Sequence, residues 1–438
     1  MALLCIIPIF VFNPQKIVME IEFISHACFI VRTNGKIIVC DPWLIGKAFN
    51  NSWALLSKPG RVDWDEVDYI FISHEHPDHF SLPTLKSIDL ETRRNITILY
   101  QKHASKRMLK AFLNLGFINI IELPLYKWKS MDGFKLYCGS AGSMDSFLAI
   151  RDGQHTVLNL NDCIFNEKQY KYIKREIGPI NFLFTQFSFA NWVGNQRDEY
   201  NEGLKKIEDI KSQIEIFMPS YTIPFASFIY FCNLENSRMN DWINTPLKIS
   251  ECNLPTIQFM YPNEAIDATN PQFDSGTAVK KYMDDFKHLI IDPKPDMLPF
   301  EDVAIAIKDN MQNFRKQIGF MLRLLVKPFG IYIHDLDKAV WLDFRKGKYE
   351  ETTKERCKYQ MCSQVCHFTF KYAWGAGTLN VSGMYIDLKI TEMSSKYFFF
   401  QNMLSTDYAS FRSVSQTIRT FRFFWQKKWE LYYKYISK

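Results

Sequence analysis

The segment Ser73–His79 carries the side chains best suited to chemistry. Its sequence is SHEHPDH, so His74, His76, Asp78 and His79 fall within six positions, directly after the apolar run VDYIFI. A loop that leaves a strand end can turn all four side chains toward one point, whereas a continuing strand would divide them between its two faces. Imidazole and carboxylate together bind zinc, and they bind iron or manganese where positions stay open to water. We therefore predict a metal site here; the alternative is a solvent-exposed loop that is rich in histidine.

The order of these four residues resembles the H-x-H-x-D-H signature of the metallo-β-lactamase fold superfamily, and the resemblance covers roughly residues 19–230 in strand order. It implies that His74 and His76 hold one metal, and that Asp78 and His79 hold a second. A later segment, HTVLNLND, ends at Asp162, which the resemblance implies as the carboxylate that bridges the two metals. Asp78, His79 and Asp162 are then the catalytic residues.

Three runs carry a narrower resemblance. The segments ISHACFIV, DPWLIGKAFNNSWAL and ISHEHPDH are similar to the branch that holds the CMP-N-acetylneuraminate hydroxylases, and lactonase-type sugar-phosphate hydrolases share the signature loop. This implies that Asp41 orients a metal-bound histidine. It also implies that His26 lies near the metal at the pocket edge, where it would contact the substrate. The residues alone leave open a turn-forming Asp41 before Pro42 and a packed His26 at a strand end.

Further substrate contacts are predicted where strands end. Asn191 and Trp192 follow the run NFLFTQFSFA, and an amide beside an aromatic face suits a pocket wall as well as a plain core and turn. Tyr221 offers a hydroxyl group to a substrate oxygen.

The ligand set implied by the resemblance is incomplete. The superfamily usually supplies another histidine between the signature loop and Asp162, but the segment CGSAGSMD has none, and MPSYTIP lacks the expected terminal histidine. His155 precedes Asp162 by seven residues on one predicted strand, about 23 Å at about 3.3 Å per residue, which is too far to share its metal. Asp145 remains as an oxygen donor or a structural carboxylate. Because fewer nitrogen ligands weaken selectivity, we predict one or two divalent ions, zinc first, with iron or manganese as alternatives.

Strand-like and helix-like segments alternate along residues 19–295. The runs EIEFISHACFIV and KIIVCDPW flank Asn34-Gly35, a strong hairpin signal. Helices are predicted near 81–90, 103–115, 166–176 and 199–213. This alternation predicts an α/β class, and the resemblance implies an αββα sandwich of mixed sheets.

The pattern changes near residue 295. Pro293, Pro295 and Pro299 mark a linker, and a helix is predicted over 301–326. Four β-like segments follow: GIYIHDL, AVWLDFR, CHFTFKYAW and TLNVSGMYIDL. We predict an N-terminal extension over 1–18, a metal-binding domain over 19–295, and a smaller C-terminal α+β domain over 296–438 that closes with an aromatic and basic helix.

Composition excludes several classes of protein. The 438 residues are 47% hydrophobic with a net charge of +6, which excludes a disordered chain. The basic residues are dispersed, so no nucleic-acid partner is expected, and the two termini are the candidate sites of contact with a membrane surface. Ten cysteines without a secretory signal predict reduced thiols in the cytoplasm. The sequence does not predict the oligomeric state.

Three functions compete. The leading hypothesis is a metal-dependent hydrolase that uses metal-activated water on an ester, lactone or phosphodiester bond of a sugar-linked small molecule. The second, implied by the resemblance, is an iron-dependent oxygenase that acts on a sugar nucleotide. Its electrons would come from a separate protein, because the sequence has no C-x-H paired with C-x-x-H, the pattern of a Rieske region. The third is a non-catalytic binding protein whose metal site has decayed.

Overall fold

The structure is a computed structural model, and it describes residues 19–103, 105–142, 144–189, 199–389, 393 and 395–405, together with residues 418, 421, 422, 425, 428 and 432. The predicted extension 1–18 and most of the predicted terminal helix lie outside these residues, as does the proposed membrane contact of the termini. Among the helices that are described, no helix combines the length and the apolar character that a membrane crossing requires.

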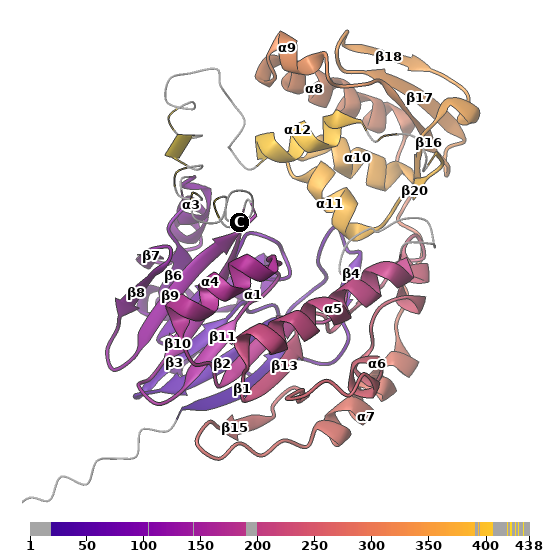
Figure 1. The fold of residues 1–438 in the computed structure, drawn as a ribbon. Coiled ribbons are helices and arrows are strands. Elements are labelled where there is room, and N and C mark those ends of the chain that lie inside the picture. The colour runs from indigo at the N-terminus through magenta and orange to yellow at the C-terminus, as the bar shows by residue number, and fades with distance from the viewer. Residues whose placement is uncertain are drawn as a thin grey trace, which may run out of the picture.

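The first sheet contains seven strands of mixed direction among the described residues (Figure 1). Strands β3, β5, β6 and β7 run parallel, which brings their C-terminal ends to one edge. The turn between β2 and β3 is the predicted one, and Asn34 and Gly35 have φ values of 51° and 70°, a region that both residue types tolerate. In spatial order the strands are β15 (Ala265–Asp267), β1 (Glu20–Ser25), β2 (Cys28–Thr33), β3 (Lys36–Cys40), β5 (Tyr69–Ile72), β6 (Thr97–Gln101) and β7 (Asn119–Leu123).

The second sheet has six strands, again counted over the described part of the chain. Its strands β11, β12 and β13 are parallel, and the others are antiparallel. In spatial order they are β13 (Tyr221–Phe225), β12 (Phe182–Gln186), β11 (Thr156–Asn159), β10 (Asp145–Arg151), β9 (Lys135–Ala141) and β8 (Lys127–Ser130). A short pair, β4 (Trp53–Leu55) with β14 (Ile229–Phe231), lies outside both sheets.

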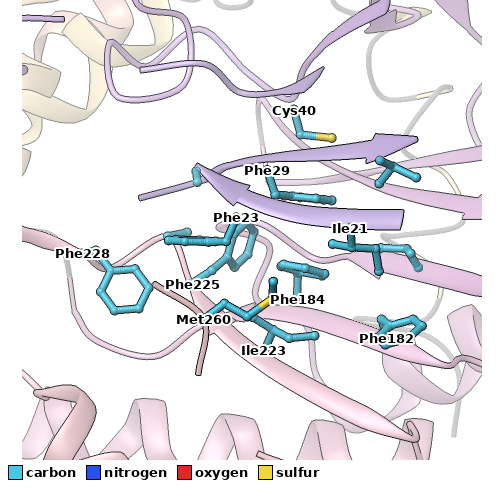
Figure 2. Close-up of a cluster of buried hydrophobic side chains, with 14 of the residues drawn as sticks. Ile21, Phe23, Phe29, Cys40, Phe182, Phe184, Ile223, Phe225, Phe228 and Met260 are labelled. Carbon is cyan, nitrogen blue, oxygen red and sulfur yellow. The ribbon is translucent and has the colours of Figure 1, made fainter. Parts of the chain in front are cut away.

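The two sheets face each other across an apolar core. Phe23 and Phe29 of the first sheet meet Phe184 and Phe225 of the second, and the rings of Phe29 and Phe184 stack with their centroids 4.2 Å apart (Figure 2). These side chains are almost fully buried. Burying apolar surface of this size is the main force that joins two sheets face to face.

Helices cover the outer faces of both sheets. Leu85 of α1 and Phe112 of α3 pack on the first sheet, and Tyr170 and Ile173 of α4 pack on the second. The predicted α/β class and αββα sandwich are confirmed. The helices up to residue 295 are α1 (Leu82–Ser87), α2 (Leu90–Asn95), α3 (Arg107–Asn114), α4 (Glu167–Ile177), α5 (Glu199–Phe217), α6 (Pro246–Glu251) and α7 (Ser275–Asp285), with the 3₁₀ turns η1 (Trp64–Glu66), η2 (Ser237–Asp241) and η3 (Phe286–His288).

The elements after residue 295, drawn at the top of Figure 1, gather around a hydrophobic cluster of their own. The predicted domain boundary near residue 295 stays a prediction, which this separate cluster supports. The strands, in spatial order, are β18 (Lys348–Glu351), β17 (Lys338–Asp343), β16 (Phe329–Ile333), β19 (Tyr359–Met361) and β20 (Ile386–Asp387). The helices are α8 (Phe300–Gln317), α9 (Phe320–Arg323), α10 (Ser363–Lys371), α11 (Gly375–Ser382) and α12 (Lys396–Ser405), with the 3₁₀ turn η4 (Lys354–Arg356).

Two predicted strands in this part are helices. The run CHFTFKYAW lies mostly in α10, where the buried residues Cys366, Thr369 and Phe370 follow a helical spacing that faces α8. Most of TLNVSG belongs to α11, and only Ile386–Asp387 of the following residues forms a strand. The predicted helix over 301–326 is also interrupted, because Ile318 is extended and the next helix begins after Gly319.

Candidate metal centre

The residues of the candidate metal centre come from three sequence-distant segments that meet at one edge of the two sheets. His26 lies in the short turn between β1 and β2, and His74 follows directly after β5. Asp162 comes three residues after the end of β11. In sheets with parallel strands, sites form beyond the carboxyl ends of the strands. The sandwich therefore brings together residues that are up to 136 positions apart in the sequence.

The imidazoles and carboxylates form two groups, each suited to one metal ion. One group contains His74, His76 and Asp162, and the other contains His26, Asp78 and His79; within a group, one ligand atom from each residue lies within 4.8 Å of the others. Each group thus offers two imidazole nitrogens and one carboxylate oxygen.

Asp162 lies between the two groups. Its Oδ2 atom is 3.9 Å from Nε2 of His74 and 3.4 Å from Nε2 of His79. The Oδ2 atom of Asp78 is 3.3 Å from Nε2 of both His26 and His79. The bridging role implied for Asp162 stays a prediction, which this central position supports.

Asp41 is a buried carboxylate that contacts His79, one of the predicted metal ligands. It is completely buried, with a positive φ of 39° directly after β3. Its Oδ1 accepts a hydrogen bond of 2.7 Å from the backbone N–H of Ser73, and its Oδ2 accepts one from Nδ2 of Asn161. The same Oδ2 lies 3.2 Å from Nδ1 of His79, on the opposite side of that ring from Asp78 and Asp162. An orienting role for Asp41 remains a prediction, and this geometry supports it.

The charges of the centre are strongly coupled. Burial lowers the pKa of His74 well below its ordinary value, and the imidazoles of His79 and His76 lower it further. Burial alone would also lower the pKa of His79, but the carboxylates of Asp78 and Asp162 raise it well above the usual range. Burial alone would raise the pKa of Asp162, but His79 and His74 hold it at about 2. The pKa of Asp78 is likewise held low, by His79 and His26 against the effect of burial.

Several buried polar atoms of the centre lack a hydrogen-bond partner. They are Nδ1 of His26, Oδ1 of Asp78 and Nε2 of His79. In addition, Nε2 of His74 and Nδ1 of His76 face each other at 2.9 Å, an approach that two nitrogen ligands of one ion also make. Buried polar groups are nearly always paired, so unpaired nitrogen and oxygen atoms within a cluster of imidazoles and carboxylates fit a bound cation. The donor set therefore suits a pair of divalent ions.

The structure places two predicted substrate contacts differently relative to the ligand groups. His26, predicted near the metal at the pocket edge, is fully buried and belongs to the second ligand group, and its role as a substrate contact stays a prediction. Tyr221 begins β13 and pairs with Phe182, whereas Gln186 at the other end of β12 reaches Asp162. Four residues separate the two ends, about 13 Å along a strand. The ring of Tyr221 stacks on Phe182 instead.

Asp145 is half-buried, and its Oδ1 lies 3.8 Å from Nε2 of His74, so it stands at the border of the first ligand group. The predicted pocket residues Asn191 and Trp192 lie outside the described residues.

Lys206 of α5 is a site residue that the sequence did not reveal. Its ammonium group donates a hydrogen bond to Oε1 of Gln186, and Nε2 of Gln186 donates to Asp162 at 3.3 Å. Burial lowers the pKa of Lys206. A lysine in a charged helix carries no signal of its own, because most such residues face solvent.

Comparisons with known proteins agree with the sequence signature. Residues 20–163 match the family model described as "Beta-lactamase superfamily domain". The cytidine monophosphate-N-acetylneuraminic acid hydroxylase of Mus musculus is 36% identical over 157 residues, which are 33% of this chain and 26% of that protein. The Danio rerio protein of the same name is 28% identical over 234 residues, which are 48% of this chain and 38% of that protein. The chain thus covers roughly a quarter to two fifths of the length of these relatives.

Among solved structures, a possible metal-dependent hydrolase from Veillonella parvula is similar, with 14% identity and a TM-score of 0.44, over 57% of this chain and 99% of that one. The resemblance implied by His74, His76, Asp78 and His79 is confirmed by the family model and by the hydroxylase relatives. Residues 20–163 therefore match a beta-lactamase superfamily domain, and the two-sheet sandwich is consistent with the metallo-β-lactamase fold.

Proposed function

We propose that this protein is a dinuclear iron-dependent hydroxylase that acts on a sugar nucleotide. The observation that carries the proposal is the composition of the two ligand groups, each with two histidines and one carboxylate. A set of two histidines and one carboxylate with open positions is typical of non-haem iron oxygenases, and catalytic zinc uses the same set in some hydrolases, so the choice of iron rests on the relatives that are named as hydroxylases. Iron held in this way supplies the activation of dioxygen that hydroxylation requires.

The relatives support the substrate class. The mouse and zebrafish proteins are named as hydroxylases of cytidine monophosphate-N-acetylneuraminic acid. A sugar nucleotide is anionic, and two cationic side chains lie near the centre. Lys206 reaches Asp162 through Gln186, and Arg107 forms a 2.8 Å ion pair with Glu75, which lies between His74 and His76. These cations are the groups that we expect to orient a substrate phosphate or carboxylate.

The residues of the chain have distinct tasks in this proposal. Asp41 fixes the orientation of the His79 ring, and the buried ring of Phe49 covers one side of His76, with the ring centroids 5.6 Å apart. Oδ1 of Asp78, which is buried and has no hydrogen-bond partner, is available to accept a hydrogen bond from a water molecule. A cavity of about 20 Å³, lined by residues that include His74, Tyr100 and Arg107, holds about one water molecule.

A metallohydrolase is the second candidate, and the position of Asp162 between the two groups favours it. A carboxylate shared by two ions is the arrangement that clamps a nucleophilic water in dinuclear hydrolases. The same donor atoms therefore serve both functions, and the identity of the metal separates them.

The first test is elemental analysis of protein purified without added metal, followed by turnover assays. We expect iron in both groups and, with iron(II), a chemical reductant, dioxygen and a CMP-linked sugar, a product that has gained one oxygen atom. His76→Ala should abolish this product, and Tyr221→Phe should keep it, because Tyr221 lies at the far end of its strand. If the protein holds only zinc and cleaves an ester, lactone or phosphodiester without oxygen, the hydroxylase proposal is refuted in favour of the hydrolase. A protein that holds no metal would refute both.

A further inference from the structure

A turn of unusual backbone conformation adjoins the metal centre. Phe49, Asn50 and Asn51 have φ values of 50°, 60° and 57°, so three consecutive residues other than glycine are left-handed. Asparagine tolerates this region, but for phenylalanine it is rare, because the Cβ atom approaches the backbone. A run of this kind persists only where the surroundings hold it in place, and such runs are concentrated at functional sites.

The base of the turn is fixed by backbone hydrogen bonds. The N–H groups of Ser52 and Trp53 both donate to the carbonyl oxygen of Ala48, at 3.0 and 3.3 Å. The carbonyl oxygen of Ser52 in turn accepts from the N–H of Cys232 at 3.0 Å. These bonds close the ends of the turn but leave its apex, Asn50, to be held by other groups.

The apex is held by the C-terminal part of the chain. Nδ2 of Asn50 donates to Oε1 of Gln364 at 3.1 Å, and Nε2 of Gln364 donates back to Oδ1 of Asn50 at 3.0 Å. Gln364 lies in the first turn of α10, next to Ser363, whose N–H and hydroxyl groups donate to the carboxylate of Asp335 at 2.8 and 2.6 Å. The two side-chain amides therefore bond to each other in both directions, and the bonds from Ser363 to Asp335 fix the position of Gln364.

The other side of the turn faces a metal ligand. The ring of Phe49 is buried between Trp53 and the imidazole of His76, with ring centroids 4.6 and 5.6 Å away and both contacts edge to face. His76 is half-buried and belongs to the first ligand group. The orientation of its ring thus depends on where Phe49 stands.

We propose that Gln364 is a positioning residue for the metal centre, acting through the turn 49–51 on His76. The inference rests on the proposed metal centre and adds a role for the part of the chain after residue 295. Without the amide pair, the turn relaxes toward a right-handed backbone, Phe49 withdraws, and the imidazole of His76 is no longer fixed.

The test is the rate at which the full-length protein loses cobalt(II) to an excess of chelator, followed by the visible absorption of the bound ion. Loss of a partner that orients a metal ligand usually costs 10- to 100-fold in metal affinity, so for Gln364→Ala we expect about tenfold faster release, the lower end of that range, because the effect is indirect. Phe49→Leu should release the ion about as fast as Gln364→Ala does. The exchange variant Asn50→Gln/Gln364→Asn retains two amides of the same combined length and should restore slow release.

Glu235→Gln is the matched control, because it breaks a different contact between the same two parts, the 3.1 Å pair with His334. It should leave the release rate unchanged. Equal rates for Gln364→Ala, Phe49→Leu and wild type would overturn the inference while leaving the metal centre intact. Equally fast release from Glu235→Gln would also overturn it, in favour of a general loosening of the interface. A wild-type protein that binds no cobalt would refute the metal centre and the inference together. Near-ultraviolet circular dichroism of each variant establishes that it is folded.

Discussion

Replacing Asp41 with asparagine changes one charge behind the metal centre and leaves the shape of the side chain almost unchanged. Asp41 accepts from Ser73 N and Asn161 Nδ2, and it lies 3.2 Å from Nδ1 of His79. An asparagine can still accept the bond from Ser73 through its oxygen. Its NH₂ group then faces two other donors, Asn161 and the Nδ1–H of His79, so the contact to His79 is lost. The substitution therefore removes the bond from Asn161 as well, and His79 is the one predicted metal ligand among the three partners.

The magnitude follows from the type of bond that is removed. A hydrogen bond to a charged partner contributes about 1.5–3 kcal/mol, which corresponds to about 10- to 150-fold in an equilibrium constant at about 1.4 kcal/mol per factor of ten. Measured losses for the outer partners of metal-bound histidines lie in about the same range, 10- to 100-fold. We therefore expect Asp41→Asn to weaken metal binding by about one to two orders of magnitude.

The assay is competition for cobalt(II) or zinc between the protein and a chelator of known affinity. Asp68→Asn provides the control, because Asp68 also accepts a backbone N–H, that of Ile37, at 2.9 Å. It precedes β5, five residues before Ser73, which is about 16 Å along the strand at about 3.3 Å per residue. Asp68→Asn should cost some stability and no metal affinity. If folded Asp41→Asn bound metal as tightly as wild type, the orienting role of Asp41 would be refuted.

Three further outcomes are expected. His26→Ala should remove one of the two bound ions and Tyr221→Phe neither, as measured by elemental analysis; two ions in both variants would exclude His26 as a ligand. Asp78 and Asp162 raise the pKa of His79, so a proton competes with the metal for that imidazole. The apparent metal affinity should therefore fall about tenfold per pH unit below the raised pKa. A metal affinity that does not change between about pH 6 and 8 would contradict this. His334 and Lys294 hold the pKa of Glu235 low, although burial alone would raise it. A depressed carboxyl pKa stabilises the folded chain above the unfolded pKa and ceases to do so as the pH falls through the folded pKa. Wild type and Glu235→Gln should therefore converge in stability in acid-unfolding curves as the pH falls below the unfolded carboxyl pKa of about 4.3 and through the depressed pKa of Glu235, and a constant difference would count against the pair.

The sandwich could be predicted because its signals are local. The alternation of residues 20–33 and the pair Asn34-Gly35 specify a hairpin without help from the rest of the chain. The segment 366–372 alternates in the same way and is nevertheless helical. There the buried residues Cys366, Thr369 and Phe370 face α8, so tertiary packing overrides the β propensity of aromatic residues.

The site was predictable only as far as residue types identify it. His74, His76, Asp78 and His79 are adjacent in the sequence, and their spacing carries the signature. The burial of His26 and the approach of Lys206 depend on how two sheets and a helix pack, and no local pattern reports either. The same holds for the turn 49–51, whose conformation depends on contacts with Gln364, more than 300 residues later.

The origin of the ligands from both sheets has a consequence for the order of folding. His26 and His74 end strands of the first sheet, whereas Asp162 follows a strand of the second. Neither sheet alone can supply all the donors of the first ligand group, so complete coordination has to wait until the apolar faces have joined. Contacts between segments this far apart in sequence form late, because chain entropy is lost before they are gained. A bound metal then stabilises the two sheets only after they have joined, so it slows unfolding without speeding folding.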